Sequence, residues 1–237
     1  MNVVILQPSY IPWRGYFDQI ARADLFIFYD DVKYDKNGWR NRNRIKTPHG
    51  ARWLTIPVHT AGVESQHTPI CEIKTDASRA WTASHLTSIR QSYAPAPYFA
   101  PTFALLQQMY AEQPALLSDF TIPTTIALAR ALGIHRTRFL RSSELVGIQG
   151  SKTRRLIEIL TRVGATRYFS GPSARDYIEE DLFHEAGIAL EYMTYAYPAY
   201  PQLYPPYDPQ VSILDLMFMT GPEALQYILP REASDDV

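Results

Sequence analysis

The first thirty or so residues place a helical stretch between two short apolar runs. Residues 3–6 are apolar and end in Gln7-Pro8, which is typical of a buried strand stopped by a residue that cannot donate to a ladder. From Gly15 the apolar residues recur with helical spacing, and residues 24–29 are a second strand-like run. Strand, helix and strand at this spacing predict a βαβ unit, and therefore a sheet with parallel strands.

The rest of the chain continues the alternation of strands and helices. Further strands are predicted at residues 51–58, 138–140, 167–170 and 188–193, and helices at residues 77–92, 98–111, 116–132, 151–163 and 213–219. We expect an α/β fold with a mainly parallel, Rossmann-like sheet covered by helices. Residues 1–237 are expected to form one α/β domain, in which the helical middle block at about residues 77–135 is a candidate subdomain.

Three segments have no regular element assigned to them. Residues 32–50 are polar and basic, and residues 195–209 carry so many Tyr and Pro residues that a surface loop is expected there. The tail from Arg231 is expected to fray.

Composition limits the classes of function. The formal net charge of -1 gives no global basic field for a nucleic-acid backbone, so nucleic acid is an unlikely partner and any anion site must be local. Cys71 is the sole cysteine, no basic and apolar leader opens the chain, and no run approaches the roughly 18 apolar residues of a membrane span. We therefore expect a cytoplasmic protein without a membrane span.

The loop after the first predicted strand is the strongest candidate site. It follows the carboxyl end of that strand, the edge at which open α/β sheets bind ligands, and Gly15 allows close approach to the free amides of the next helix. A turn made rigid by proline, with its aromatic residues packed on the core, is the structural alternative. The candidate ligand or phosphate contacts of this loop are Gln7, Ser9, Tyr10 and Gly15, with Tyr16 as a candidate catalytic residue.

A cationic segment follows the second predicted strand. It contains Lys33, Lys36, Arg40, Arg42, Arg44 and Lys46, interleaved with Tyr34, Trp39, Asn41 and Asn43. Arginine can bind phosphate in a bidentate manner, and the acids Asp30, Asp31 and Asp35 suit a ligand with phosphate plus hydroxyls or a metal. Lys33, Asp30 and Asp31 are candidate catalytic residues, and Trp39, Arg40, Asn41, Arg42 and Asn43 are candidate ligand contacts. A solvated loop with salt bridges at its rim is equally consistent with this pattern.

Weaker signals lie further along the chain. Lys152 opens a predicted helix and is a candidate anion contact, although the spacing of a P-loop is absent. Ser212 is expected to cap the last helix and is a candidate ligand contact next to a tyrosine-rich loop. The six histidines show no metal-ligand spacing, so the metal is unknown; His59 and His85 alone are of interest.

Several separated motifs resemble the WbqC-like protein family, nearly from end to end. The motifs are Gln7-Pro8-Ser9-Tyr10-Ile11-Pro12-Trp13 with Gly15-Tyr16-Phe17, Trp39-Arg40-Asn41-Arg42-Asn43, Trp53-Leu54-Thr55-Ile56-Pro57-Val58, Tyr168-Phe169-Ser170-Gly171 and Ser212-Ile213-Leu214-Asp215-Leu216. The resemblance implies a bacterial protein of surface-polysaccharide or related small-molecule biosynthesis. It supplies no established catalytic residue.

A second likeness is one of form. A strand, a proline-containing loop, Gly15-Tyr16 and an amphipathic helix resemble the HIGH-type entry of HUP-type nucleotide-binding enzymes, such as nucleotidyltransferases and pantothenate synthetase. Tyr16 replaces the usual histidine, which removes a stabiliser of phosphate charge that Lys152 or Arg42 would have to replace. The likeness makes ATP and Mg²⁺ the candidate cofactors.

These observations lead to three hypotheses. The first is a biosynthetic enzyme that transfers or ligates an acyl or aminoacyl group onto an amine of a nucleotide-linked sugar or related phosphorylated metabolite. The second is a non-catalytic scaffold or partner subunit that uses its Tyr and Pro surface, and adenylyl transfer is a further alternative. The first hypothesis requires the helix entrance near Gly15 and the cationic segment to meet at one pocket.

Overall fold

A five-stranded parallel sheet is the centre of the computed structural model, which describes residues 1–229. The strands are β1 (Asn2–Leu6), β2 (Leu25–Phe28), β5 (Arg138–Arg141), β6 (Arg167–Ser170) and β7 (Ala189–Tyr192). Their order is β5-β2-β1-β6-β7, and each neighbouring pair is parallel. The chain builds outward from β1 to one side and then, with β6, to the other, as in doubly wound sheets. The α/β prediction is confirmed. The tail expected to fray lies outside the described residues.

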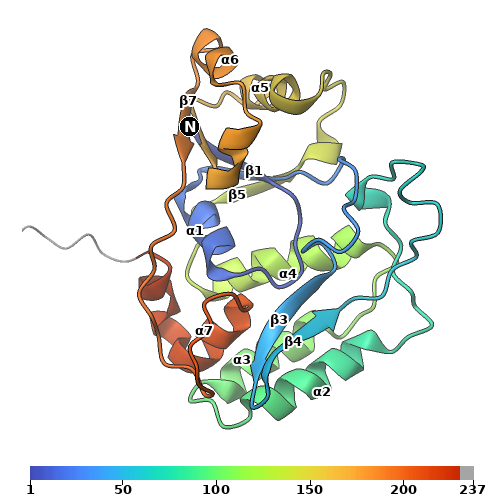
Figure 1. Cartoon of the computed structure of the whole chain (residues 1–237), viewed down its shortest axis with the longest axis vertical. Helices are drawn as coiled ribbons and strands as arrows, with labels where there is room; N and C mark the ends of the chain where they lie inside the picture. The colour runs from blue at the N-terminus through green and yellow to red at the C-terminus, as the bar shows by residue number, and fades with distance from the viewer. Residues whose placement is uncertain (230–237) are drawn as a thin grey trace, which may run out of the picture.

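The two faces of the sheet are covered by different helices. Val4, Phe26 and Phe28 belong to one buried cluster, whereas Val3 and Ile27 belong to another. Neighbouring residues of a strand point to opposite faces, so these continuous apolar runs supply both clusters. Figure 1 shows α5 and α6 on one side of the sheet and α1 and α4 on the other.

Each predicted helix is present, although the one predicted at residues 77–92 begins at residue 81, and one further helix was not predicted. The helices are α1 (Arg14–Arg22), α2 (Trp81–Tyr93), α3 (Phe99–Met109), α4 (Leu117–Ala131), α5 (Lys152–Arg162), α6 (Glu180–Glu185) and α7 (Ile213–Thr220). The short helix α6 was not predicted, because its six residues are too few to show helical spacing. Short 3-10 turns lie at η1 (Ile70–Glu72), η2 (Ser142–Glu144), η3 (Pro172–Asp176) and η4 (Gly221–Tyr227).

An antiparallel hairpin stands apart from the parallel sheet. It pairs β3 (Arg42–Thr47) with β4 (Gly50–Thr55). The sequence predicted the second strand, but the prediction of no strand in the polar segment at residues 32–50 is wrong, because β3 lies within it. The strand was missed because its inward residues include the polar Asn43, which is as buried as Ile45 and hides the expected alternation.

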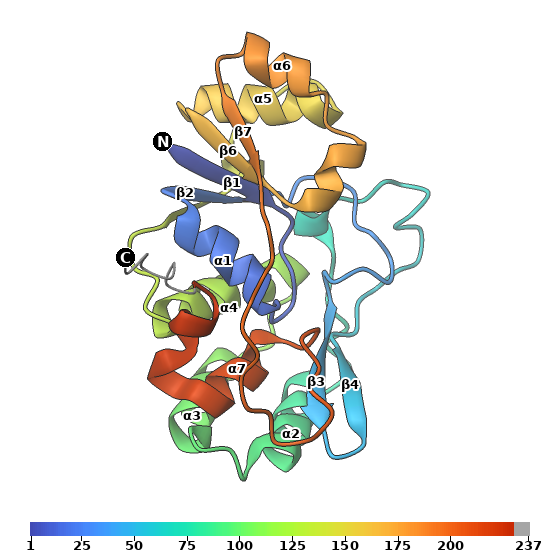
Figure 2. The same ribbon diagram turned by 60° about the vertical axis from the view of Figure 1, so that its left-hand side comes forward.

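Residues 193–211, which follow β7, form no strand or helix, as predicted for the Tyr- and Pro-rich segment. They pass over α1 and are called the strap. Figure 2 shows it descending from β7 past α1 towards the hairpin. The hydroxyl of Tyr197 donates to Asp18 at 2.7 Å, and Arg14 donates to the Pro198 carbonyl at 2.8 Å and to the Tyr207 hydroxyl at 2.9 Å. Buried polar bonds to α1 therefore fix the path of the strap.

A buried carboxylate joins the strap to α2 and α7. Asp215 accepts hydrogen bonds from Tyr93 and Tyr200 at 2.9 Å each and from Gln202 at 2.8 Å. Burial raises the pKa of Asp215, and these three donors oppose the rise. Ser212 begins α7 as predicted, because its hydroxyl accepts from the Leu214 amide at 3.3 Å.

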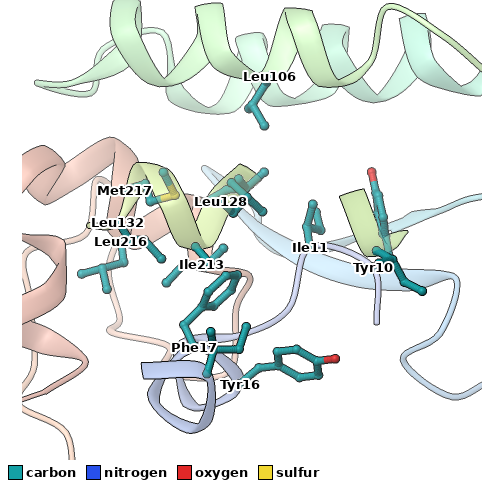
Figure 3. Close-up of a cluster of buried hydrophobic side chains, with 14 of the residues drawn as sticks. Tyr10, Ile11, Tyr16, Phe17, Leu106, Leu128, Leu132, Ile213, Leu216 and Met217 are labelled. Atoms are coloured by element: carbon teal, nitrogen blue, oxygen red, sulfur yellow. The ribbon is translucent and has the colours of Figure 1, made fainter. Parts of the chain in front are cut away.

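The core below the sheet predicts a large loss of stability on truncation of Phe17. Figure 3 shows Phe17 pointing from α1 towards Ile213 of α7, in a cluster that also contains Leu128 of α4. Phe17 is fully buried, so Phe17→Ala should lower the free energy of unfolding by about 3–5 kcal/mol in urea titrations. The control Val146→Ala, at a residue that is 85% exposed, should change it by less than about 0.5 kcal/mol. Equal losses in both variants would contradict this account of the core.

Candidate binding site at the carboxyl edge of the parallel sheet

A pocket of about 530 Å³ lies beyond the carboxyl ends of β1 and β6. These strands flank the point where the strand order reverses, which is where doubly wound sheets bind ligands. The volume is within the range of small-molecule sites. The pocket is lined by Leu6, Gln7, Ser9, Pro12, Trp13, Tyr16, Gln19, Trp39, Arg40, Asn43, Gly171, Pro172, Ser173, Tyr195 and Gln210. The loop before α1 and the cationic segment therefore meet at one pocket.

Two other hollows have similar volumes. One of about 520 Å³ lies between α5 and α6, and one of about 590 Å³ lies beside the tip of the hairpin. Neither is lined by residues that directly follow a strand of the parallel sheet. The position at the switch point favours the first pocket as the functional one.

The pocket loop contains a strained residue. Ile11 has a φ of 35°, in the left-handed region that a β-branched residue rarely adopts. The Asn43 side-chain amide donates to the carbonyl oxygens of Tyr10 at 3.1 Å and Ile11 at 2.9 Å. Because both carbonyls are held by a single buried amide, the hairpin fixes the shape of the loop.

Arg40 supplies the positive charge of the pocket wall. Its guanidinium donates to the carbonyl oxygens of Gln7 at 3.2 Å and Pro8 at 3.3 Å, and its Nε lies 3.1 Å from a carboxylate oxygen of Asp35. The side chain is 12% exposed, and burial lowers its pKa. Among the described lining residues Arg40 is the only cation and no carboxylate occurs, although its pairing with Asp35 offsets part of that charge.

Tyr16 lines the same wall as a protonated phenol. Its hydroxyl donates to the Gln7 carbonyl at 3.0 Å. Burial raises the pKa of Tyr16, and the nearby Arg40 opposes that rise only in part. At neutral pH Tyr16 is therefore a hydrogen-bond donor that supports the loop.

Buried hydrogen bonds connect the pocket loop to the helical block. The hydroxyl of Tyr10 lies 2.8 Å from Nδ1 of His85 on α2 and 2.5 Å from the hydroxyl of Tyr110, the residue after α3. Burial lowers the pKa of His85 to about 4, so its ring is neutral at pH 7. Tyr10 is wholly buried and does not line the pocket; its side chain anchors the loop from behind.

Several polar side chains of the pocket have no partner within the described part of the chain. No hydrogen bond of the Gln7 side chain or the Ser9 hydroxyl joins another described group, and both residues line the pocket. Gln19 donates from Nε2 to the Tyr195 hydroxyl at 2.8 Å, while its buried Oε1 has no partner. Such groups are bound by water or by a ligand, because unmade buried hydrogen bonds are costly.

Aromatic rings complete the walls. Trp13 meets Tyr195 edge to face, with 5.0 Å between ring centroids. A Cβ at Gly15 would lie 2.4 Å from the Trp13 ring, so glycine is what lets this indole fold against the first turn of α1. Gly15 thus shapes the wall but does not line the pocket.

Three candidate catalytic residues from the sequence lie outside the pocket. Asp30 is fully buried and accepts from the Ser143 amide at 3.0 Å and the Ser143 hydroxyl at 2.9 Å. Asp31 forms an ion pair with Arg155 and accepts from the Ser142 hydroxyl at 2.5 Å. Lys33 is exposed and bridges Pro69 through its backbone. They follow β2, whereas the pocket opens beyond β1 and β6.

The other predicted contacts divide between the pocket and the surrounding framework. Trp39, Arg40 and Asn43 line the pocket with Gln7 and Ser9. Asn41 accepts from Tyr34 at 2.9 Å and donates to the Ile56 carbonyl at 2.8 Å, within the framework. Arg42 stacks on Trp53, Ser212 caps α7, and Lys152 is an exposed residue at the start of α5 on the far face of the sheet.

A second side of the pocket was not predicted from the sequence. It is formed by Gln19, Ser173, Tyr195 and Gln210, which come from α1, η3 and the strap. Gly171 follows the predicted strand at residues 167–170 directly, so the strand order would have revealed this side, but single-sequence patterns do not give strand order.

Residues 1–229 contain no group of three or more His, Cys, Asp or Glu side chains arranged to hold a metal ion. No helix among them has the length and apolar character needed to cross a bilayer.

The fold defines a class, the parallel α/β proteins with a doubly wound sheet, and here a pocket lies at the switch point of that sheet. Residues 7–227 match the model of the WbqC-like protein family, and the chain belongs to that family. It is 42% identical over 229 residues to "uncharacterized protein Rv1507c" of Mycobacterium tuberculosis (strain ATCC 25618 / H37Rv), covering 96% of this chain and 97% of that protein. No solved structure matches the chain.

The buried position of His85 behind the pocket loop predicts a pH dependence of stability. The folded-state pKa of His85, about 4, is below its ordinary value of 6.5, so the unfolded chain binds the proton more readily. His85 should therefore destabilise the fold as the pH falls from about 6.5 towards 4, by up to about 3 kcal/mol, and should have no such effect above pH 6.5.

The measurement is urea unfolding of wild type and His85→Gln at pH 7 and pH 4.5. The variant carries no titrating ring, so it should lose less stability than wild type between the two pH values. Equal losses in the two proteins would show that His85 is not a buried neutral histidine.

Proposed function

We propose that this protein is a biosynthetic enzyme that transfers or ligates an acyl or aminoacyl group onto an amine of a nucleotide-linked sugar or a related phosphorylated metabolite. The observation that carries the proposal is the pocket at the switch point, where Arg40 lies among unpartnered amide and hydroxyl groups and aromatic walls. Nucleotide sugars are made in the cytoplasm, which is the compartment this proposal assigns.

The lining suits a sugar with one anionic group. Hydroxyl and amino groups of a sugar can donate to and accept from Gln7 and Ser9, and Oε1 of Gln19 is an acceptor for an N–H or O–H group. Arg40 is a single guanidinium, enough for a phosphate but not for a long polyanion.

The lining of the pocket is compatible with acylation of an amine. Among the described lining residues there is no carboxylate or imidazole, the usual general bases. An amine with a pKa near 8 is partly unprotonated at neutral pH and is itself a nucleophile. Its nitrogen would form a bond to the acyl carbon, the leaving group would depart with the electron pair of its bond, and the amine proton would pass to solvent.

The acyl donor determines the cofactors. An amino acid or carboxylic acid would have to be activated first, and ATP with Mg²⁺ is the proposed source of that activation; a pre-activated thioester would need neither. Incubation with a UDP- or dTDP-linked amino sugar and each donor in turn, read by mass spectrometry, tests the reaction. A mass gain equal to the acyl group supports it. No gain with any donor, despite binding of the sugar nucleotide, would favour the non-catalytic partner subunit.

Gln7 provides a direct test of the pocket. Gln7→Leu keeps the volume of the side chain but removes its amide, so the affinity for a UDP- or dTDP-linked amino sugar should fall about 10-fold. Isothermal titration calorimetry measures the affinity, and the melting temperature without ligand should stay unchanged. Gln107→Leu, at an exposed residue of α3, is the matched control and should bind like wild type. Wild-type affinity in Gln7→Leu would place the ligand elsewhere.

A further inference from the structure

Two tryptophans are exposed side by side where the pocket borders the hairpin; Trp53 also lines the hollow beside the hairpin tip. Trp39 is 44% exposed and Trp53 is 43% exposed, and their ring centroids lie 5.2 Å apart with the planes inclined by 35°. Trp39 also lines the pocket. Adjacent exposed indoles leave apolar surface in water, and such a surface commonly marks a site that another group covers.

Two arginines adjoin this pair on the outer face of the hairpin. In the register of β3 with β4, Arg44 is paired with Trp53 and Arg42 with Thr55, so the two arginines share a face with the indole. Their guanidinium carbons lie 4.5 Å (Arg42) and 5.7 Å (Arg44) from the ring centroid of Trp53. Within the described residues neither arginine pairs with a carboxylate. Each does donate to a carbonyl oxygen, Arg42 to that of Asn37 and Arg44 to that of Gln210, so the two arginines offer an anion an uncompensated positive charge and their remaining N–H groups.

This surface is continuous with the pocket. Arg44 donates to the backbone carbonyl of Gln210 at 2.7 Å and to its side-chain oxygen at 3.1 Å, and Gln210 lines the pocket. The amide of Tyr10 donates to the Trp39 carbonyl at 3.1 Å, which ties the first indole to the pocket loop. Trp39 and Gln210 therefore connect the lining of the pocket to the outer face of the hairpin.

We infer that Trp39, Trp53, Arg42 and Arg44 form a second subsite that binds the nucleoside diphosphate part of the ligand. The base stacks on the exposed indoles, since every nucleobase has a π face, and the diphosphate lies against the two guanidinium groups. The inference rests on the proposed function, in which the pocket holds the sugar. It assigns the two halves of a nucleotide sugar to two surfaces that meet at Trp39.

The chemistry favours this occupant over a nucleic acid strand. Two arginines match the charge of one diphosphate, and the net charge of the chain is -1, so no extended basic track would follow a longer backbone. Both occupants would stack bases, however, so the test must separate them.

The experiment compares ligands that contain different parts of a nucleotide sugar. UDP, UDP-linked amino sugar, glucose 1-phosphate and a short oligouridine are titrated by calorimetry into wild type, Trp53→Leu and Arg42→Gln. Trp53→Leu should weaken UDP and UDP-sugar about 10-fold or more and leave glucose 1-phosphate unchanged. Arg42→Gln should also weaken both uridine ligands. The control is Arg52→Gln, at an exposed arginine paired with Ile45 on the opposite face of the hairpin, which should bind as wild type does.

The outcomes separate this inference from the proposed function. If wild type binds UDP-sugar and Gln7→Leu weakens it while Trp53→Leu and Arg42→Gln do not, the subsite is overturned and the pocket stands. If Trp53→Leu weakens UDP but UDP-sugar binds no more tightly than UDP, the subsite stands and the sugar pocket fails. No binding of either uridine ligand overturns both. Tighter binding of oligouridine than of UDP, with a steep salt dependence, replaces the nucleotide sugar by a nucleic acid.

Discussion

The pocket depends on the contact between the Asn43 amide and the carbonyl groups of Tyr10 and Ile11. Ile11 is held at a φ of 35°, a conformation costly for a β-branched residue and stable only when its surroundings specify it. The hydrogen bonds that Asn43 donates from the hairpin hold Ile11 in this conformation. Without them the loop after β1 would relax, and Gln7, Ser9 and Trp13 would lose their common orientation.

The hairpin is one of three structures that hold the loop. From behind, His85 and Tyr110 share the hydroxyl of Tyr10, which makes the helical block a support of the site although it contributes no lining residue. From the far side, the strap brings Tyr195 against Trp13 and Gln19. Elements far apart in sequence thus meet at a loop with few internal hydrogen bonds, an arrangement that fixes the shape of the pocket.

The sequence predicted the fold well because the parallel strands are buried on both faces and therefore appear as continuous apolar runs. It also predicted that the segments near Gly15 and Arg40 meet at one pocket. It did not show that Asp30 and Asp31 bind Ser142, Ser143 and Arg155. An aspartate that follows a strand can contact a ligand or can hold the fold together, and the sequence pattern is the same in both cases. That distinction needs the strand order, which places the crevice beyond β1 and β6.

The sequence also did not show which cations of the segment at residues 32–50 lie at the pocket. Read as a sequence, its arginines form one basic cluster, but a strand sends alternate side chains to opposite faces. Asn41, Asn43 and Ile45 turn inward, where Asn43 binds the pocket loop and Ile45 packs in the core. Arg42 and Arg44 turn outward onto Trp53. Arg40, just before the strand, is the one that lines the pocket. Because β3 divides the cluster in this way, the positive charge is spread from the pocket wall to the hairpin surface. A ligand with charge along its length matches that distribution better than one with charge at a single point.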